Sequence, residues 1–339
     1  MNFEINNSII LWYYAYGGIS MKTIAVLTSG GDAPGMNACI RAVVRTAGAR
    51  GMKVYGVNRG YNGLMEDDIY EMNLRTVSDI IDRGGTILYS ARSLKFKTEE
   101  GMNQAVEVCK KRGIEGIVVI GGDGSFRGAR DLSLKGIPCI GIPGTIDNDI
   151  CCTDYTIGLD TCLNTIVSMV DRVRDTSESH DRCTVVEVMG RKAGYLALES
   201  GLAVGASYII IPEKPYSLED VIKRMNYTLK LDKRHFVIVV AEGIGGVANL
   251  AKRIEEETGI ESKSVVLGHV QRGGSPSAKD RIVAALMGNY AVNLLLEGKG
   301  NRVVAMKKDE IVDYDIYEAL SMTKDINLNE YDIAMEISI

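Results

Sequence analysis

The stretch Lys22-Thr23-Ile24-Ala25-Val26-Leu27 runs directly into Thr28-Ser29-Gly30-Gly31-Asp32-Ala33-Pro34-Gly35-Met36-Asn37, and together they decide the fold class. The first part is a short, apolar, β-branched run that predicts a fully buried strand. A helical pattern follows from Ala38 to Arg50, so the glycines stand between a strand and a helix. Such glycines let backbone amides approach an anion, and the helix N-terminus adds partial positive charge. There is no Gly-Lys-Ser/Thr, so this is not a Walker A loop, and a turn that serves only packing remains the alternative.

Short apolar runs of this kind recur along the chain and alternate with helix-length segments. The candidate strands are Ile24–Leu27, Lys53–Val57, Gly116–Ile120, Cys139–Ile142, Thr184–Val188, Tyr208–Ile211 and Phe236–Val240. The alternation indicates βαβ units and a mainly parallel sheet. A chain of 339 residues exceeds the comfortable size of one hydrophobic core. We therefore predict an α/β fold with two domains.

The domain boundaries carry no Ser- or Pro-rich linker, so the chain can cross between domains more than once. We expect one domain over 21–156 plus 270–320 and a second over 157–269 plus 321–339. Residues 1–20 precede the first strand and contain the apolar run Ile9 to Tyr16, which is shorter than the roughly twenty residues of a membrane-spanning helix. We interpret residues 1–20 as an N-terminal extension.

The composition limits the classes of partner. Hydrophobic residues make up 46% and charged residues 24% of the chain, as in an ordinary globular protein. The formal net charge of -5 argues against nucleic-acid or anionic-membrane binding, which needs a broad basic field. Seven cysteines without CxxC spacing and three histidines predict neither a disulfide framework nor a structural zinc site. A reducing cytoplasm fits this usage best.

Two further strand-end segments carry carboxylates. Gly121-Gly122-Asp123-Gly124-Ser125 follows one candidate strand, and Asp123 suits a magnesium ion that already carries phosphate oxygens and waters. A helix cap is the alternative for Asp123. Pro143-Gly144-Thr145-Ile146-Asp147-Asn148-Asp149 follows the next strand. A carboxylate there can accept the proton of a sugar hydroxyl that attacks phosphorus. As an isolated segment it could also be a surface turn.

Positive charges that could hold phosphates come from other segments. They are Ser90-Ala91-Arg92, Arg182, Met189-Gly190-Arg191 and His269-Val270-Gln271-Arg272-Gly273-Gly274. Arginine offers a planar fork that matches phosphate oxygens. Taken singly, each arginine could equally be a solvated surface charge.

The motifs TSGGDAPGMN, GGDGS, PGTIDND, EVMGR and GHVQRGGSP, in this order and spacing, closely resemble the bacterial ATP-dependent 6-phosphofructokinase family. The resemblance extends from Met21 to Ile339. It implies two Rossmann-like three-layer domains, one for ATP and one for the sugar phosphate, in a cytoplasmic homotetramer. It also implies magnesium-dependent transfer of the ATP γ-phosphoryl to the 1-hydroxyl of fructose 6-phosphate.

The resemblance also implies roles for individual residues. Asp147 is expected to be the general base and Asp123 the magnesium carboxylate, with Thr145, Asp149, Arg92 and Arg191 beside them in the active site. The implied ATP-site residues are Gly31, Arg92, Ser93, Gly122, Asp123, Gly124 and Ser125. The implied sugar-phosphate residues are Thr145, Ile146, Asp147, Met189, Gly190, Arg191, Glu242, His269, Val270, Gln271 and Arg272. Arg182 and Lys263 are expected to reach into the sugar site of a neighbouring subunit.

The donor can be argued from two glycines. In the similar pyrophosphate-dependent enzymes the positions of Gly124 and Gly144 carry aspartate and lysine. A carboxylate at 124 would repel the α-phosphate of ATP, whereas a lysine at 144 would bind the shorter donor. Glycine at both positions therefore favours ATP.

The chain departs from the family pattern at several positions. Lys263 replaces an arginine and lacks its bidentate fork, so we expect a looser grip on the 6-phosphate. In the family's effector pocket between subunits, the matching cations are Arg41, Arg45, Arg174, Lys233, Arg234 and His235. Ser207, Leu231 and Leu74 replace a magnesium-binding glutamate, a lysine and an arginine found in some members. This leaves the ADP response open, while an anion such as phosphoenolpyruvate could still bind the remaining cations.

Three other interpretations compete with this one. A pyrophosphate-dependent phosphofructokinase is disfavoured by Gly124 and Gly144. A kinase acting on NAD or a lipid shares a GGDG loop but gives no reason for the GTIDND and MGR segments. A non-catalytic phosphosugar sensor should have lost its base or metal carboxylate, and this chain keeps both Asp147 and Asp123.

Overall fold

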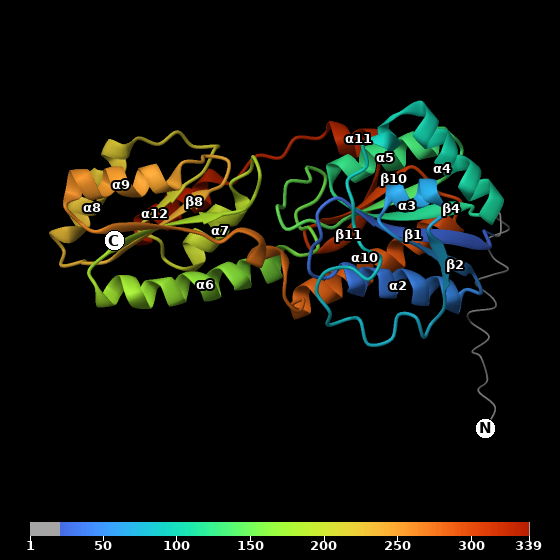
Figure 1. Ribbon diagram of the computed structural model, residues 1–339, viewed down its shortest axis with the longest axis horizontal. Helices are drawn as coiled ribbons and strands as arrows, with labels where there is room; N and C mark the ends of the chain where they lie inside the picture. Colours follow the sequence, from blue (N-terminus) through green and yellow to red (C-terminus); the bar gives the residue numbers. More distant parts are fainter. Residues whose placement is uncertain (1–20, 339) are drawn as a thin grey trace, which may run out of the picture.

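The computed structural model describes residues 21–338, which form two lobes, each built on its own sheet (Figure 1). The seven-stranded sheet has the order β11-β10-β5-β4-β1-β2-β3, and the four-stranded sheet has the order β7-β8-β6-β9. Helices cover the faces of both sheets (Figure 1). The prediction of an α/β fold with mainly parallel sheets is confirmed, and the expected extension over residues 1–20 lies outside the described residues.

The strands and helices have the following bounds. The strands are β1 (Thr23–Ser29), β2 (Lys53–Val57), β3 (Ile69–Met72), β4 (Gly116–Gly121), β5 (Cys139–Pro143), β6 (Cys183–Val188), β7 (Tyr208–Ile210), β8 (Phe236–Ala241), β9 (Ser262–Val266), β10 (Arg302–Lys307) and β11 (Glu310–Asp315). The helices are α2 (Met36–Ala49), α3 (Tyr61–Glu66), η1 (Lys95–Lys97), α4 (Glu99–Arg112), α5 (Asp123–Leu134), α6 (Leu159–Ser179), α7 (Tyr195–Ala203), α8 (Leu218–Leu229), α9 (Val247–Thr258), η2 (Gly268–Arg272), α10 (Ala278–Leu296), α11 (Ile316–Ser321) and α12 (Leu328–Ile337).

All seven candidate strands are present, within two residues of the expected ends. Four further strands were not expected from the sequence. β9 is an edge strand of sequence SKSVV and lacks a continuous apolar run. β10 and β11 form a hairpin through Lys308 and Asp309, both at positive φ. That conformation is typical of a two-residue hairpin turn, but these residues replace the usual Asn-Gly signal.

The parallel pairing brings the functional loops to one edge of each sheet. β4 lies between β1 and β5 and runs parallel to both, so the segments that follow these three strands leave the sheet side by side. In the second sheet, β6 lies between β8 and β9, again with parallel pairing. Ligands of such sheets bind at the carboxyl ends of the strands. The fold therefore groups the glycine- and carboxylate-bearing loops before any side-chain contact is considered.

The chain crosses between the lobes more than once. It leaves the first sheet after β5, returns after β9 through α10, and crosses again between α11 and α12 (Figure 1). Asp280 of α10 anchors the first crossing: its buried carboxylate accepts hydrogen bonds from Tyr155 Oη (2.6 Å), Gly158 N (2.7 Å) and Thr161 N (2.8 Å). The domain boundaries drawn from the sequence stay a prediction.

The last helix, α12, packs on α7 and β7 of the second lobe. Tyr331 fixes it by donating a hydrogen bond to Ile209 O at 3.1 Å. Across residues 21–338, no helix combines the length and the apolar character that a membrane crossing requires.

Candidate active site

Asp147 lies where the strand-end loops of the first lobe meet those of the second. Its side chain is fully buried. Oδ2 accepts a hydrogen bond from Thr145 Oγ1 (3.2 Å) and forms an ion pair with Arg191 Nε (3.0 Å). Arg272 Nη2 lies 3.9 Å from Oδ1, which has no hydrogen-bond partner within residues 21–338. A buried carboxylate oxygen with a free lone pair is suited to accept a proton from a bound hydroxyl.

Arg191 comes from the turn that follows β6 in the second lobe. Gly190 has φ 133°, and a Cβ there would lie 2.6 Å from Ala193 O, so only glycine fits this turn. Arg191 itself has φ 55°, and its N–H donates to Glu242 Oε1 at 2.7 Å. This turn aims the guanidinium across the junction, where it contacts Asp147 of the other lobe.

Asp149 is the second carboxylate of the same loop, and Arg191 Nη1 lies 3.5 Å from its Oδ2. Burial raises the pKa of Asp149, the nearby Asp147 raises it further, and Arg191 partly offsets both effects. Asp123 also raises this pKa, which shows that the three carboxylates share one electrostatic environment. Like charges are therefore crowded at this edge of the sheet.

Asp123 is the first residue of α5, and its Oδ2 accepts from Arg127 Nη2 at 2.9 Å. No group of three or more His, Cys, Asp or Glu side chains within residues 21–338 is arranged to hold a metal ion. Magnesium is commonly held by one or two carboxylates together with substrate phosphates, so such a cage is not required. Asp149 Oδ1 is buried without a hydrogen-bond partner in the described chain. This acidic oxygen, in the same electrostatic environment as Asp123, fits a hard cation brought in with a phosphate ligand.

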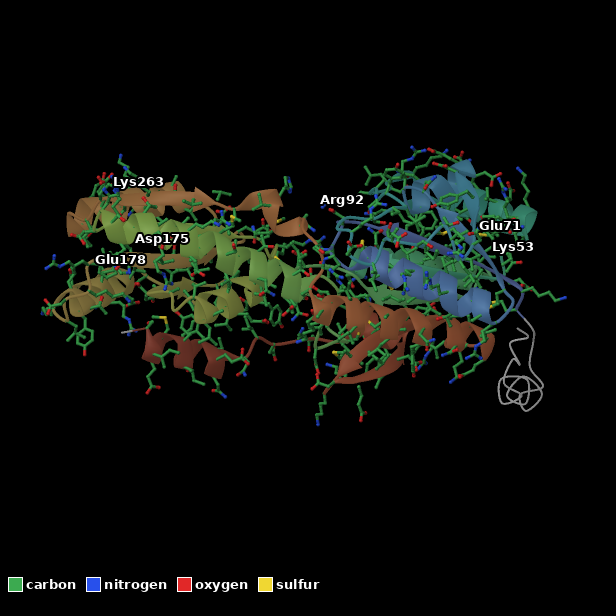
Figure 2. The ribbon with its side chains drawn as sticks, turned by 90° about the horizontal axis from the view of Figure 1, so that it is seen from below. Lys53, Glu71, Arg92, Asp175, Glu178 and Lys263 are labelled. Atoms are coloured by element: carbon green, nitrogen blue, oxygen red, sulfur yellow. The ribbon has the colours of Figure 1, made fainter. Side chains whose placement is uncertain are left out.

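The expected nucleotide side is open at Gly124, where an added Cβ would meet nothing within 4 Å. Arg92 is exposed and makes no hydrogen bond or ion pair with the rest of the described chain; Figure 2 places it at the junction of the lobes. Ser125 and Ser93 are occupied locally, because Ser125 Oγ donates to Ser29 O (3.0 Å) and Ser93 Oγ accepts from Phe96 N (3.1 Å).

Glycines 31, 122 and 144 differ in their surroundings. A Cβ on Gly31 would lie 2.7 Å from Arg272 Nη1, so this guanidinium lies against the first glycine loop. Gly122 has extended backbone and precedes α5. A Cβ on Gly144 would lie 3.0 Å from Ile120 Cγ2 and 3.2 Å from Met36 Cε. A side chain at residue 144 would thus require Ile120 and Met36 to shift, whatever the donor.

The expected sugar side combines exposed and buried residues. His269 and Val270 are exposed, whereas Gln271 is fully buried. Gln271 Oε1 accepts from Met189 N (3.0 Å) and Nε2 donates to Gly268 O (3.0 Å), so this side chain joins η2 to the loop after β6. Ile146 is fully buried in the core, which leaves only its backbone for contact with a ligand.

Arg182 and Lys263 lie away from Asp147 of their own chain. Arg182 directly precedes β6, and Lys263 is the second residue of β9, so both are at the amino end of the second sheet. Both pair with Glu261, at 2.7 Å and 3.1 Å. Figure 2 shows Lys263 on the second lobe, far from Arg92. Their expected reach into a neighbouring subunit stays a prediction.

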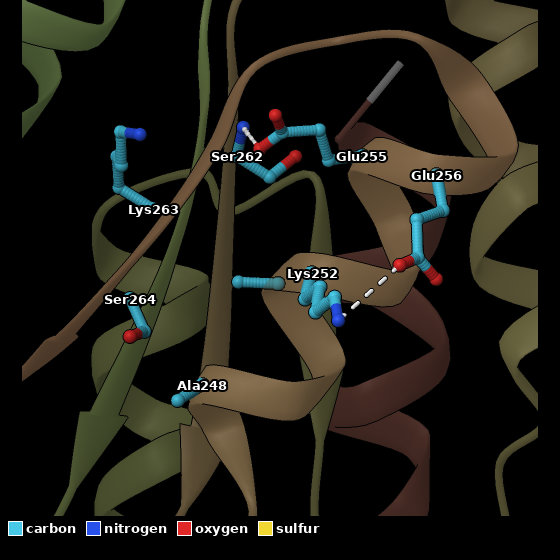
Figure 3. A pocket seen from close by; sticks show the side chains of 8 residues that line it. Ala248, Lys252, Glu255, Glu256, Ser262, Lys263 and Ser264 are labelled. Atoms are coloured by element: carbon cyan, nitrogen blue, oxygen red, sulfur yellow. Dashed lines mark hydrogen bonds and ion pairs between the residues drawn. The ribbon is translucent and has the colours of Figure 1, made fainter.

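Lys263 also lines a hollow of about 590 Å³ between α9 and β9 (Figure 3). Glu255 on the helix side accepts from Ser262 N at 3.0 Å, and Lys252 pairs with Glu256 at 3.6 Å. The hollow is separate from the carboxylate cluster, because none of the loops around Asp147 contributes to it.

The residues matched to the effector pocket divide between the lobes. Arg41 and Arg45 are on α2 of the first lobe, whereas Arg174, Lys233, Arg234 and His235 belong to the second. Lys233 Nζ donates to Ser338 O (3.1 Å), and burial lowers its pKa, with Arg224 and Arg174 adding to the effect. Ser207 is buried with its Oγ near Val237 N, and Leu231 and Leu74 are half exposed. Arg224 of this basic cluster belongs to no motif and was missed by the sequence reasoning.

A second hollow, of about 420 Å³, adjoins the carboxylates themselves. It is lined by Asp149, Cys151, Arg191, Lys192, Ala193, Tyr195, Glu213 and Lys324. Lys324 comes from the segment between α11 and α12, where nothing in the sequence marks it as a site residue.

Comparisons with known proteins match this chain over both lobes. The family model described as phosphofructokinase matches residues 23–295. The chain belongs to the phosphofructokinase family. It is 55% identical to an ATP-dependent 6-phosphofructokinase of Brevibacillus brevis and 56% identical to one of Clostridioides difficile, in each case over 94% of this chain and 100% of the relative.

Solved phosphofructokinases also share the fold. A phosphofructokinase from Saccharomyces cerevisiae matches with a TM-score of 0.85 and 35% identity, over 94% of this chain and 48% of that one. A pyrophosphate-dependent phosphofructokinase from Marinobacter aquaeolei matches with a TM-score of 0.81 and 25% identity, over 91% and 86%. Because a protein named as pyrophosphate-dependent matches almost as well in shape as one whose name gives no donor, the phosphofructokinase fold alone does not identify the donor.

The raised pKa of Asp149 has a consequence for stability. When the pKa of a carboxyl is higher in the folded than in the unfolded protein, the free energy of unfolding falls as pH rises from the unfolded-state pKa through the folded-state pKa. Above the folded-state pKa, the ionised Asp149 destabilises the folded protein by the full amount. Below the unfolded-state pKa, Asp149 is protonated in both states and does not destabilise the fold. We therefore expect Asp149→Asn to raise the free energy of unfolding at pH 7–8 by about 0.5–2 kcal/mol, the size of common stabilising substitutions, with no gain at acidic pH.

Urea unfolding at several pH values measures this effect. Asp154→Asn is the matched control: burial acts to raise the pKa of Asp154, but hydrogen bonds from Lys307 and Lys308 outweigh it and the pKa is lowered. That variant should lose stability at neutral pH. Equal stability of Asp149→Asn and the parent at pH 7–8 would contradict the burial argument.

Proposed function

We propose that this chain is an ATP-dependent 6-phosphofructokinase, which transfers the γ-phosphoryl group of ATP to the 1-hydroxyl of fructose 6-phosphate, a step of glycolysis. The observation that carries the proposal is the buried Asp147 carboxylate, held by Arg191 of the opposite lobe with one oxygen left free. The names of the relatives at 55% and 56% identity support the same activity.

The geometry of Asp147 supports its proposed role as the base. As the sugar O1 attacks the γ-phosphorus, its proton passes to the free Oδ1, the new P–O1 bond forms, and the bond to the ADP oxygen breaks. Arg191, from the second lobe, and Arg272 keep the carboxylate oriented. Thr145 Oγ1 fixes the other carboxylate oxygen, so that a single oxygen remains for the substrate.

The phosphate side of the reaction needs positive charge. Asp123, with Asp149 nearby, would hold a magnesium ion that neutralises charge on the transferring phosphates when the nucleotide is bound. Arg92, exposed at the junction without a protein partner in the described chain, can turn to the transferring group. The first lobe would bind ATP and the second the sugar phosphate.

The sugar phosphate would contact the residues that surround Arg191. Glu242 fixes the Arg191 backbone, and Gln271 fixes Met189. His269 and Arg272 on η2 add two polar groups at the same edge. Arg182 and Lys263, which sit at the amino end of the second sheet, would serve a neighbouring subunit of a homotetramer.

Regulation would use the cations of both lobes. A pocket formed by Arg41 and Arg45 of one subunit with Arg174, Lys233, Arg234 and His235 of another could take an anionic effector such as ADP or phosphoenolpyruvate. The cytoplasm is the expected location.

A coupled assay tests the proposal. With ATP, Mg²⁺ and fructose 6-phosphate we expect production of ADP and fructose 1,6-bisphosphate, and with pyrophosphate no turnover. The same assay with and without ADP and phosphoenolpyruvate reports on the effectors. Turnover with pyrophosphate alone would overturn the donor assignment, and no turnover with either donor would favour a non-catalytic sensor.

A further inference from the structure

Lys324 connects the linker between the lobes to the carboxylate loop. It lies in the segment from 322 to 327, which crosses from α11 of the first lobe to α12 of the second (Figure 1). Its Nζ donates a hydrogen bond to Asn148 O at 3.1 Å. This carbonyl belongs to the peptide between Asp147 and Asp149, so a single bond from the linker reaches the part of the loop that joins the two carboxylates.

The Asn148 backbone needs such support. Asn148 is a buried residue with φ 50°, in the left-handed region, which residues other than glycine adopt at a cost that asparagine reduces through local hydrogen bonds of its side chain. Residues in such conformations persist where the surroundings over-determine them. The side chain supplies one restraint, since Asn148 Nδ2 donates to Asp154 O at 3.3 Å. Lys324 supplies the restraint on the carbonyl.

Lys324 is tied to the second lobe as well. Its Nζ lies 4.6 Å from the centroid of the Tyr195 ring, and Tyr195 Oη donates to Lys324 O at 3.4 Å. Tyr195 is the first residue of α7, four residues after Arg191. Lys324 thus links the loop that carries Asp147 to the element that follows the Arg191 turn, which holds Asp147 from the other side.

The Lys324 ammonium does not stabilise the fold through a salt bridge. Lys324 forms no ion pair with any side chain of the described chain, and burial is the main cause that lowers its pKa. A partly buried cation costs free energy, and the negative charges of Asp154 and Glu199 offset this cost only in part. Its partners are a carbonyl and a ring face, beside the hollow that Asp149 and Arg191 also line. An arrangement that costs stability at this place is expected of a positioning group.

We infer that Lys324 is a positioning residue: by holding the Asn148 carbonyl and the Tyr195 ring together, it sets the orientation of the Asp147–Asp149 loop relative to Arg191. In this role it acts through the loop that carries Asp147 rather than by direct contact with a substrate. The inference rests on the proposed function, because its readout is the turnover that Asp147 is proposed to support.

The first test compares Lys324→Met with Lys324→Arg in the full-length protein. The methionine variant removes the donor and keeps the length of the side chain. Because small misplacements of reacting groups cost up to about 100-fold in rate, we expect kcat to fall by about 10- to 100-fold with KM for fructose 6-phosphate nearly unchanged. Arginine keeps both the donor and the cation–π contact, so Lys324→Arg should retain clearly more activity than Lys324→Met.

Lys214→Met is the matched control. Lys214 makes a similar contact with a tyrosine, Nζ lying 4.2 Å from the ring centroid of Tyr331 on α12, and it also pairs with Asp332 at 2.7 Å. It has no contact with the Asn148 loop among the described residues. We expect Lys214→Met to keep parental kcat, even if its unfolding temperature falls.

Chemical rescue separates positioning from folding. Lys324→Ala removes most of a side chain that lines the hollow of about 420 Å³. A small ammonium ion can diffuse through this hollow into the space that the lysine side chain filled. Added ethylammonium should raise kcat of folded Lys324→Ala in a saturable way, whereas tetramethylammonium, which cannot donate a hydrogen bond, should not. Circular dichroism confirms that the variant is folded before the amine is added.

Two results would overturn the inference: parental kcat in Lys324→Met, or a loss of kcat that neither arginine nor ethylammonium restores in folded protein. In either case the parent enzyme still turns over, so the proposed function survives. An inactive parent would instead remove the proposed function itself.

Discussion

Asp147→Asn is expected to lower kcat for ATP and fructose 6-phosphate by about 100- to 10,000-fold, the range that general-base catalysis contributes. Asparagine keeps the size of the side chain and can still meet Thr145, but its amide cannot accept the proton of the sugar hydroxyl. Because Arg191 keeps Asp149 as a second partner at 3.5 Å, the guanidinium is not left without a carboxylate. The loss should therefore appear in turnover rather than in folding.

Steady-state kinetics and fructose 6-phosphate binding measured by calorimetry check this expectation. The dissociation constant should change little, since the proton is transferred only as the reaction proceeds. Asp154→Asn, the same substitution at a carboxylate that pairs with Lys307 on the surface, should keep parental kcat. A near-normal rate for Asp147→Asn would refute the base assignment.

The catalytic loops were predictable from the sequence because each follows a buried strand. Residues such as Asp147, Asp123 and Arg191 lie at strand or helix ends, and parallel pairing puts these ends at one edge of a sheet. The glycine turns add a second signal, because backbone conformation at Gly190 depends on the residue type. Local sequence thus predicts where these groups lie, and their catalytic roles stay predictions.

Other features depend on contacts between distant segments and could not be predicted locally. Lys324 is 176 residues from Asn148, and Gln271 is 82 residues from Met189. Their partners are backbone groups, which have no residue-specific signal. Ile146 was expected to contact substrate as part of its motif, but its side chain fills the core. A motif therefore identifies a loop without distinguishing the side chains that face a ligand from those that hold the loop.

Gly144 illustrates the same limit for the donor. The sequence argument gave Gly124 and Gly144 equal weight as room for ATP. In the structure a Cβ at Gly144 would crowd Ile120 and Met36, so this glycine has a packing reason of its own. Gly124 has no such neighbour within 4 Å, and the donor argument rests on it more strongly.

Gly124→Asp is expected to lower kcat/KM for ATP by about 100-fold or more, because placing like charges together costs several kcal/mol. The protein itself should accept the substitution: an added Cβ meets nothing within 4 Å, and residue 124 lies in the first turn of α5, where a negative side chain is favourable. Unfolding temperature should stay the same or rise slightly. The loss would then come from repulsion between the new carboxylate and the nucleotide phosphates.

Gly124→Asn separates charge from bulk. It has nearly the same volume as the aspartate variant, so it should keep much more of the ATP activity if repulsion is the cause. The two variants and the parent are compared by initial rates over a range of ATP concentrations, with pyrophosphate as the second donor. Equal losses in both variants would assign the effect to bulk, and full ATP activity in Gly124→Asp would contradict the assignment of this glycine to the donor site. Because the fold is shared with a pyrophosphate-dependent enzyme at a TM-score of 0.81, discrimination between donors must come from side chains at such positions rather than from the arrangement of the sheets.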